Sequence, residues 1–283
     1  MLMLDRTTGG RGGQTVNVST YEALDKACSG SEPRIIIVSG KIHHEGRVNC
    51  GSNKSIIGKN GAELIGNGFF IKHSKNIIIR NLKISKVKAT YGDAIGIQTT
   101  SHVWIDHVDV SSDQTHDKDY YDGLIDLTHA TDFVTISNSL IHDHWKGCLF
   151  GHSDNNAAED TGHLRITMYG NLIKNVNSRG PSLRFGTSHI FNNVYQNMTT
   201  GINVRKGAQV LVEGNYFSGI KEPLFSVDNE GGVVERGNIF GAGAVKVAKS
   251  GGRLTSVPYR YQVIPAQEAF SQVSRTVGAT LNI

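Results

Sequence analysis

Three aspartates in the middle of the chain are the residues whose types and spacing could bind a metal ion. Asp93 precedes a short apolar run, and Asp122 and Asp126 lie in the sequence YDGLID at residues 121–126. Side chains alternate along a strand, so a spacing of four places Asp122 and Asp126 on the same face. Three carboxylates at short range repel one another unless a cation binds between them. Oxygen ligands of this type suit calcium, which accepts about 6 to 8 of them in irregular geometry.

The same acidic stretch also allows a simpler interpretation. Seven aspartates lie within residues 106–126, and aspartate is common in turns and on solvated faces. On that interpretation the carboxylates form a loose acidic patch without the geometry of a site. A second feature favours a site, because the sequence RGPSLR at residues 179–184 places Arg179 and Arg184 five residues apart. Clustered acids together with paired arginines indicate a site for a polyanion.

The composition favours an all-β fold and an acidic partner. The 283 residues include 33 Gly and only 5 Pro, which is typical of many tight turns and few long helices. The net charge of +4 would attract nucleic acid, an anionic membrane or an acidic polysaccharide. Lys and Arg are scattered without a run of five like charges, so we expect no nucleic-acid partner. The apolar residues 1–4 are too few for a secretory signal and no stretch is long enough to span a membrane, so neither is expected.

Short β-rich runs that end in a polar turn repeat along the chain. The spacings between successive turn residues are 26, 31, 33, 22, 22 and 23, and these residues are Asn81, His107, Asn138, Asn171, Asn193, Asn215 and Asn238. A repeat near 22 residues without helical patterning predicts a parallel β-helix with coils about 4.8 Å apart. Stacked asparagines would then form a hydrogen-bonded ladder. The longer repeats carry insertions at residues 116–119 and 153–161, where functional loops are expected.

The two ends of the repeat are expected to be covered. Residues 19–22 (STYE) form a capping box that predicts a helix ending near Cys28. The first strands are predicted at residues 34–40 and 55–58, and a second helix at residues 267–277 is expected to pack on the coils. No linker is visible, so we expect one domain at residues 1–283, with an N-terminal cap at about 1–33, coils at about 34–243 and a C-terminal segment at about 244–283.

Three cysteines occur in the chain. Cys28 and Cys50 flank the predicted helix-to-strand unit and could be bridged. Cys148 lies in an apolar run and is expected to be a buried, unreactive thiol.

On these motifs the chain resembles the pectate lyase family, also called polysaccharide lyase family 1. The resemblance implies a single-domain right-handed parallel β-helix with a short N-terminal capping helix and a C-terminal segment packed on the coil. Its motifs run in family order from about residue 7 to 217, and they are TTGG (7–10), VSG (38–40), GSNKSIIG (51–58), GDAI (92–95), VWIDH (103–107), YDGLID (121–126), RGPSLR (179–184) and IFNN (190–193).

The resemblance assigns a role to six residues. Lys146 would bind the substrate, although Trp145 and Gly147 depart from the usual family residues. Arg179 would be the catalytic base, which is demanding because a guanidinium normally keeps its proton. Arg184 would hold a substrate carboxylate. The calcium ligands would be Asp93, Asp122 and Asp126.

By the same resemblance, the protein would be a secreted, monomeric, calcium-dependent enzyme. Its substrate would be (1→4)-α-D-galacturonan (polygalacturonate), cleaved by β-elimination to 4,5-unsaturated oligogalacturonides. A pectin lyase acting on methyl-esterified pectin is the nearest alternative, but that class lacks the calcium-binding acids. A polygalacturonase would hydrolyse with paired aspartates and water, and its usual motifs are absent from this sequence. A non-catalytic β-helical carbohydrate-binding protein remains the non-enzymatic alternative.

Overall fold

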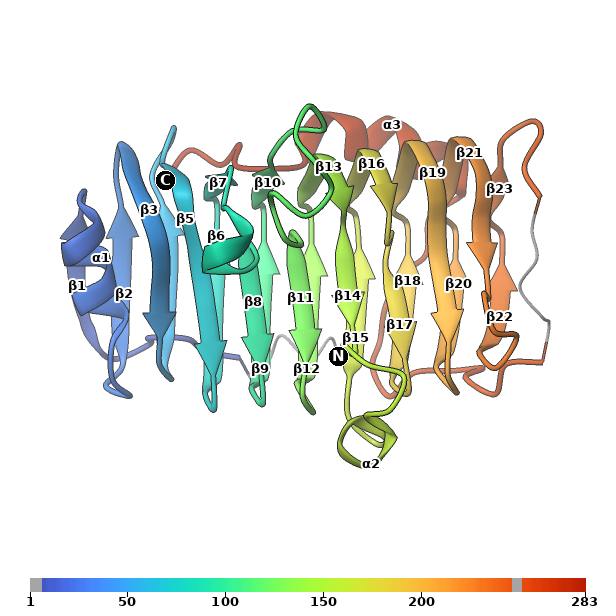
Figure 1. Ribbon diagram of the computed structural model, residues 1–283, viewed down its shortest axis with the longest axis horizontal. Helices are drawn as coiled ribbons and strands as arrows, with labels where there is room; N and C mark the ends of the chain where they lie inside the picture. Colours follow the sequence, from blue (N-terminus) through green and yellow to red (C-terminus); the bar gives the residue numbers. More distant parts are fainter. Residues whose placement is uncertain (1–6, 246–250) are drawn as a thin grey trace.

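Short parallel strands stacked along one long axis make up most of the protein (Figure 1). The computed structural model describes residues 7–245 and 251–283. Each coil contributes one strand to a first sheet and further strands to a second sheet. All pairings between named strands in the described residues are parallel, as the 22-residue repeat predicts. The fold is therefore a parallel β-helix of about ten turns.

The first sheet follows the order of the coils without a crossover. Its ten strands are β1 (Gln14–Val18), β2 (Arg34–Val38), β4 (Lys54–Gly58), β6 (Lys75–Arg80), β9 (Ser101–Asp106), β12 (Asp132–Ser137), β15 (Arg165–Tyr169), β18 (Thr187–Phe191), β20 (Gln209–Glu213) and β22 (Gly232–Arg236). The sequence predicts the strands from residue 34 onward, but not β1, whose side chains are mostly exposed and polar.

The second sheet covers the remaining sides of the β-helix. Its thirteen strands are β3 (Lys41–Cys50), β5 (Glu63–Lys72), β7 (Lys83–Ser85), β8 (Ile95–Gln98), β10 (Asp109–Ser111), β11 (Ile125–Thr128), β13 (Leu140–Lys146), β14 (Cys148–Phe150), β16 (Leu172–Ser178), β17 (Ser182–Arg184), β19 (Val194–Arg205), β21 (Tyr216–Phe225) and β23 (Ile239–Phe240). The first half of β5 pairs with β7 and its second half with β8. This long strand therefore joins two rows of shorter strands, and β8, β11, β14 and β17 form one of these rows.

Apolar side chains point inward and stack from coil to coil. One column of the first sheet aligns eight side chains that have no exposed surface: Ile36, Ile56, Ile79, Ile105, Ile136, Met168, Ile190 and Val212. Burying a side chain of this size stabilises the fold by about 1.5 to 3 kcal/mol. A slip of one residue would turn the whole column outward, so the core fixes the register of every coil.

A ladder of buried asparagines runs along one corner of the coils. The side-chain amide nitrogens of Asn171, Asn193 and Asn215 each donate to Oδ1 of the next member, at 2.8, 3.0 and 3.0 Å, and Asn238 ends the ladder. The predicted ladder of seven positions is thus correct for four of them. In the preceding coil the ladder position is occupied by Ser139, whose backbone nitrogen donates to Asn171 Oδ1.

The other three predicted ladder residues lie one position earlier in their coils. Asn81, His107 and Asn138 have φ of 55°, 50° and 49°. The later coils place Gly170, Asn192, Gly214 and Gly237 at this point, also with positive φ. Asn, Gly and, less often, His tolerate this left-handed conformation. Each repeat therefore contains a left-handed turn residue followed by a ladder residue. The sequence alone does not distinguish these two positions, because Asn occurs at both.

Both expected helices are present, but only one covers an end of the β-helix, because α3 (Ala266–Thr276) packs along the side of the coils near β16, β19 and β21 (Figure 1). Helix α1 (Tyr21–Cys28) covers the first coil, with the Thr20 hydroxyl accepting from Ala23 N at 3.2 Å. Helix α3 lies within one residue of its predicted bounds, and its Phe270 ring contacts Tyr216 at 4.6 Å between centroids. No helix in the described ranges is both long and apolar enough to cross a membrane.

Both predicted insertions leave the coils as loops. Residues 112–124 connect β10 with β11, and residues 151–164 connect β14 with β15 and carry the short helix α2 (Ala157–Asp160), seen at the lower edge of Figure 1. The 3-10 helix η2 (Ala89–Tyr91) precedes β8.

The three cysteines are buried free thiols. The bridge between Cys28 and Cys50 that the sequence left open is therefore absent, although burial and then contact with Cys50 raise the pKa of the Cys28 thiol. Burial also raises the pKa of Cys148, which fits the expected unreactive thiol.

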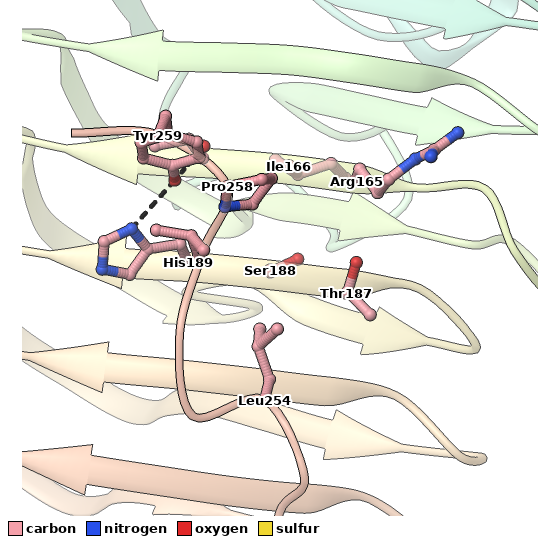
Figure 2. Close-up of a pocket in the computed structure, with 10 residues that line it drawn as sticks. Arg165, Ile166, Thr187, Ser188, His189, Leu254, Pro258 and Tyr259 are labelled. Atoms are coloured by element: carbon pink, nitrogen blue, oxygen red, sulfur yellow. Dashed lines mark hydrogen bonds between the residues drawn. The ribbon is translucent and has the colours of Figure 1, made fainter. Parts of the chain in front are cut away.

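The C-terminal segment, described from residue 251 onward, returns over the outer face of the first sheet. Figure 2 shows Pro258 and Tyr259 beside β15 and β18, around a cavity of about 70 Å³. The Tyr259 hydroxyl lies 2.8 Å from Thr167 Oγ1 and 2.9 Å from His189 Nδ1. Further on, Leu281 N donates to Asn81 Oδ1 at 2.9 Å. These contacts fasten the end of the chain to coils far from it in sequence; the predicted start of this segment includes residues 246–250, which lie outside the described residues.

Candidate functional site

The register of β8, β11, β14 and β17 brings polar residues from distant parts of the chain to one surface. Asp126 lies beside Gly96 on one side and Leu149 on the other. Because the strands are parallel, the residues that precede them gather at one border, which we call the entry edge: Asp93, Asp122, Lys146 and Arg179. The residues at and after their carboxyl ends form the opposite border, the exit edge: Gln98, Thr128, His129, His152 and Arg184.

A cavity of about 290 Å³ lies between the two edges. Asp93, Asp122, Asp126 and Arg179 line it on the entry side. The structure therefore brings together four of the six residues that the sequence singled out. Of the other two, Lys146 contacts one of these four, while Arg184 lies at the exit edge, outside the cavity lining.

Two of the carboxylates face the same gap beside Gly123. Asp93 Oδ1 accepts a hydrogen bond from Gly123 N at 2.8 Å. A Cβ at residue 123 would lie 2.8 Å from Asp93 Oδ1 and 2.5 Å from Asp126 Oδ1, so only glycine leaves this space open. Asp126 Oδ1 is buried and has no hydrogen-bond partner in the described residues. A buried carboxylate oxygen without a partner is costly, which indicates that something else belongs beside it.

The three aspartates also act on one another electrostatically. Burial raises the pKa of Asp93 to about 6, and the charge of Asp122 adds to the shift. Burial followed by the charge of Asp93 raises the pKa of Asp126 well above its ordinary range. Arg179 opposes both shifts. The acids are therefore a coupled cluster rather than a loose solvated patch, and a cation placed among them would relieve the repulsion.

The three cations differ in how firmly they are held. Lys146 Nζ lies 3.2 Å from Asp122 Oδ1 and 3.1 Å from Asp119 Oδ1, in the loop at residues 112–124. Arg179 is held only loosely, with Nη1 4.0 Å from Asp126 Oδ2.

Arg184 is held by the other inserted loop. Its Nε donates to Asp154 Oδ1 at 2.5 Å and its Nη1 to Gly151 O at 2.8 Å. Asp154 also accepts from Arg205 Nη2 at 2.8 Å. Each of the two insertions thus supplies a carboxylate to one of the predicted substrate-binding cations.

The donor set fits a hard divalent cation. Within the described ranges no three His, Cys, Asp or Glu side chains already converge on one point as a finished metal site. The unpartnered Asp126 Oδ1, the gap at Gly123 and the mutual repulsion nevertheless meet the requirements of an oxygen-ligated cation. Three carboxylates offer up to six oxygens, which are the ligands that hard cations take.

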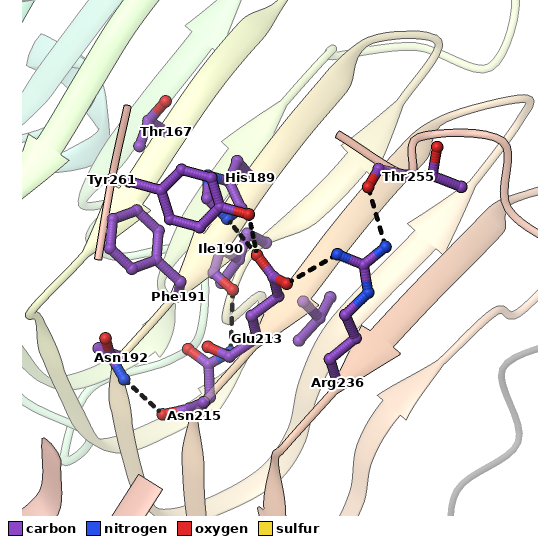
Figure 3. A network of polar contacts seen from close by, with 12 residues as sticks. Thr167, His189, Ile190, Phe191, Asn192, Glu213, Asn215, Arg236, Thr255 and Tyr261 are labelled. Carbon is purple, nitrogen blue, oxygen red and sulfur yellow. Dashed lines mark hydrogen bonds and ion pairs between the residues drawn. The ribbon is translucent and has the colours of Figure 1, made fainter. Parts of the chain in front are cut away.

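A second cluster of titratable groups, on the first sheet, has a structural role. Figure 3 shows Glu213 accepting from Tyr261, His189 and Arg236. His189 is 2% exposed and lies beneath the C-terminal segment, where burial lowers its pKa. Because these groups are hydrogen-bonded to one another, the cluster holds the C-terminal segment against the first sheet and leaves no open position for a substrate.

Sequence reasoning missed the exit edge and the loop carboxylates. Gln98, Thr128, His129 and His152 line the cavity but carry no motif of their own. Their only sequence signal is that each lies at or just after the carboxyl end of a strand of the same row. Asp119 and Asp154 lie inside the insertions that the repeat lengths do reveal.

The fold and the site together assign the chain to the class of parallel β-helix proteins with a cavity that joins carboxylates to cations. Comparison with known sequences makes the assignment specific. The model of the pectate lyase family matches residues 5–281. Probable pectate lyase A of Aspergillus flavus is 55% identical over 266 residues, which are 93% of this chain and 82% of that protein. Pectate lyase A of Emericella nidulans is 52% identical over 277 residues, or 97% and 84% of the two chains.

Solved structures agree with the sequence comparison. A pectate lyase from Bacillus sp. N165, in complex with trigalacturonate, superposes with a TM-score of 0.87 at 31% identity and covers 98% of both chains. Pectate lyase II of Xanthomonas campestris superposes with a TM-score of 0.86 at 30% identity, covering 98% of this chain and 97% of that one. The chain belongs to the pectate lyase family and is a polysaccharide lyase.

The raised pKa of Asp93 predicts a pH-dependent gain in stability for Asp93→Asn without added metal. A raised carboxyl pKa means that the folded state binds the extra proton, so the wild type loses stability as pH rises from about 4 through about 6. We expect Asp93→Asn to raise the free energy of unfolding by about 1 to 3 kcal/mol at pH 8 and hardly at all at pH 4. Urea denaturation at both pH values, with Glu32→Gln as an exposed control, measures this. An equal effect at both pH values would contradict the predicted coupling.

Proposed function

We propose that this protein is a calcium-dependent pectate lyase that cleaves polygalacturonate by β-elimination and releases 4,5-unsaturated oligogalacturonides. The observation that carries the proposal is Asp126 Oδ1, which is buried beside Asp93 and has no hydrogen-bond partner in the described residues. The other oxygen of the same carboxylate, Oδ2, lies 4.0 Å from Arg179 Nη1. Membership of the pectate lyase family supports the reaction class. The trigalacturonate complex of the Bacillus relative supports the type of substrate.

Asp93, Asp122 and Asp126 would hold the calcium ion at the entry edge. When bound, it would neutralise a substrate carboxylate and so make the neighbouring C5 proton more acidic. Without a cation, the carboxylates of the protein would repel the anionic substrate. The same three acids therefore explain why pectate, and not its uncharged methyl ester, is the proposed substrate.

The proton transfer is assigned to Arg179. Among the cations at the entry edge it is the less engaged, because Lys146 has carboxylate contacts at 3.1 and 3.2 Å whereas Arg179 has one at 4.0 Å. Arg179 would act in its neutral form: after its guanidinium has released a proton to water, it would take the C5 proton, the electrons of the C5–H bond would form the C4–C5 double bond, and the C4–O bond would break. The departing glycosidic oxygen would take a proton from water.

Lys146 and Arg184 are proposed to bind substrate carboxylates. Negative charge develops on the uronate carboxylate as the C5 proton leaves, and a fixed cation stabilises that charge most strongly in the transition state. Both side chains are already held in place by loop carboxylates, Asp119 and Asp154. Such positioning reduces the cost of ordering long side chains when the substrate binds.

Three further properties belong to the proposal. We propose that residues 1–283 form one domain, because the coils share one continuous hydrophobic core from Val18 to Val233. We propose secretion, since a polymeric pectin substrate lies outside cells. A monomer is proposed on the resemblance to the pectate lyase family.

A chelator assay tests the metal and the substrate together. We expect formation of the conjugated double bond on polygalacturonate to fall by at least about 100-fold in chelator and to return when calcium is added in excess. Ultraviolet absorbance of the product measures this, with highly methyl-esterified pectin as the comparison substrate. Full activity on esterified pectin in chelator would identify a pectin lyase instead, and a product without the double bond would indicate hydrolysis.

Replacing the proposed base tests the catalytic assignment separately. We expect Arg179→Lys to lower kcat by about 10²- to 10⁴-fold, because a positioned proton acceptor contributes that much. Oligogalacturonate affinity should change little, since a positive charge is retained. Calorimetry and the lyase assay measure the two quantities, with exposed Arg11→Lys as the control. A kcat within twofold of the wild type would remove Arg179 from the mechanism.

A further inference from the structure

The exit edge of the cavity carries polar groups that the proposed elimination does not use. Gln98, Thr128 and His152 line the cavity opposite the acids and Arg179. In the described parts of the chain, none of these three side chains has a hydrogen-bond partner. Thr128 is 6% exposed as a residue, and it lines the cavity. Polar groups left open inside a binding cavity are available to a ligand or to water.

His152 is held in place by its neighbours. Its ring stacks on that of His129, with centroids 4.1 Å apart and planes inclined by 23°. His129 Nδ1 lies 2.9 Å from Glu159 Oε2, and Glu159 also accepts from Asn156 Nδ2 at 2.8 Å. A stack fixed by two successive contacts orients the outer ring while leaving its nitrogens free.

The loop that carries His152 is itself hydrogen-bonded to the turn between β11 and β12. Ala130 N donates to Asp160 Oδ1 at 2.7 Å, and Asp160 is fully buried. Asn156 Nδ2 donates to Asp160 Oδ2 at 2.8 Å. The position of His152 therefore follows from the fold of residues 151–164 and does not depend on a bound ligand.

The two edges differ in the chemistry that they can recognise. The entry edge carries formal charges. At the exit edge Arg184 lies outside the cavity lining, and an amide and a hydroxyl line the cavity instead. Partial burial, and then the neighbouring His129, lower the pKa of His152, which favours the uncharged ring. Neutral groups that both donate and accept suit sugar hydroxyls better than they suit a carboxylate, for which cations are the stronger partners.

The spacing of the edges matches a single sugar unit. Asp126 and Thr128 are two residues apart on β11, which corresponds to about 6.6 Å along the strand. A pyranose ring can bridge that distance with its carboxylate on one side and its ring hydroxyls on the other. Phe70 and Leu149, both only partly buried, supply apolar surface between the edges.

We propose that Gln98, Thr128 and His152 bind the free 2- and 3-hydroxyl groups of the galacturonate unit whose carboxylate faces the entry edge. This inference rests on the proposed pectate lyase function and adds a second selectivity, for hydroxyl groups that are not acylated. An acetyl group on either oxygen removes a hydrogen-bond donor and adds bulk beside His152 and Thr128 in the cavity lining. His129 and Glu159 act as positioning residues for His152.

The test compares polygalacturonate with the same polymer acetylated chemically at its 2- and 3-hydroxyls. Thr128→Val keeps the shape of the side chain and removes its hydroxyl, so KM on polygalacturonate should rise about three- to tenfold with kcat within twofold. His152→Ala opens the space, so the wild-type preference for the unacetylated polymer, measured as a ratio of kcat/KM values, should fall at least threefold.

His163→Ala is the matched control, because His163 lies in the same loop but is directed toward Asp132, with Nδ1 3.7 Å from its Oδ2. Equal thermal unfolding midpoints would exclude misfolding, and His152→Phe, which keeps the stacked ring without nitrogens, should raise KM as Thr128→Val does. The inference is overturned if both KM and the preference stay at wild-type values in these variants. Wild-type protein without lyase activity on polygalacturonate would instead reject the underlying function.

Discussion

The parallel register of the coils is the constraint on which the rest of the structure depends. A column of fully buried side chains from Ile36 to Val212 aligns successive coils, and a one-residue slip would expose it. The same register places Asp126 between Gly96 and Leu149, two coils of otherwise unrelated sequence. The hydrophobic core therefore determines where the charged side chains meet, although it makes no contact with a substrate.

Electrostatic strain is concentrated where this register brings the acids together. Asp93 and Asp126 have raised pKa values because they are buried next to like charge, and Asp126 Oδ1 finds no partner within the described chain. By contrast, the buried polar groups in the cluster around Glu213 and in the asparagine ladder are hydrogen-bonded to one another. Carboxylates whose pKa values are raised by burial and by one another are typical of functional sites, and a bound cation would offset their repulsion.

Much of this could be predicted from the sequence, because both the repeat and the family motifs are local. The β-helix, helices α1 and α3, both insertions and the grouping of Asp93, Asp122 and Asp126 follow from short patterns. The ladder was predicted with three wrong members, because Asn serves two purposes: side-chain bonding at residue 193 and a left-handed backbone at residue 138. The hydrogen bond from Arg184 to Asp154 and the stacking of His129 on His152 depend on how a loop folds back onto the coils. The spacing of the sequence repeats carries no information about that fold.

The central claim is that three carboxylates from two successive coils hold one divalent cation beside Arg179. Crystals grown with calcium and a trigalacturonate, measured for anomalous scattering, test it most directly. The account predicts one strong peak within bonding distance of carboxylate oxygens of Asp93, Asp122 and Asp126, about 2.3 to 2.6 Å away. A fully occupied peak elsewhere in the cavity, with these carboxylates unliganded, would contradict it.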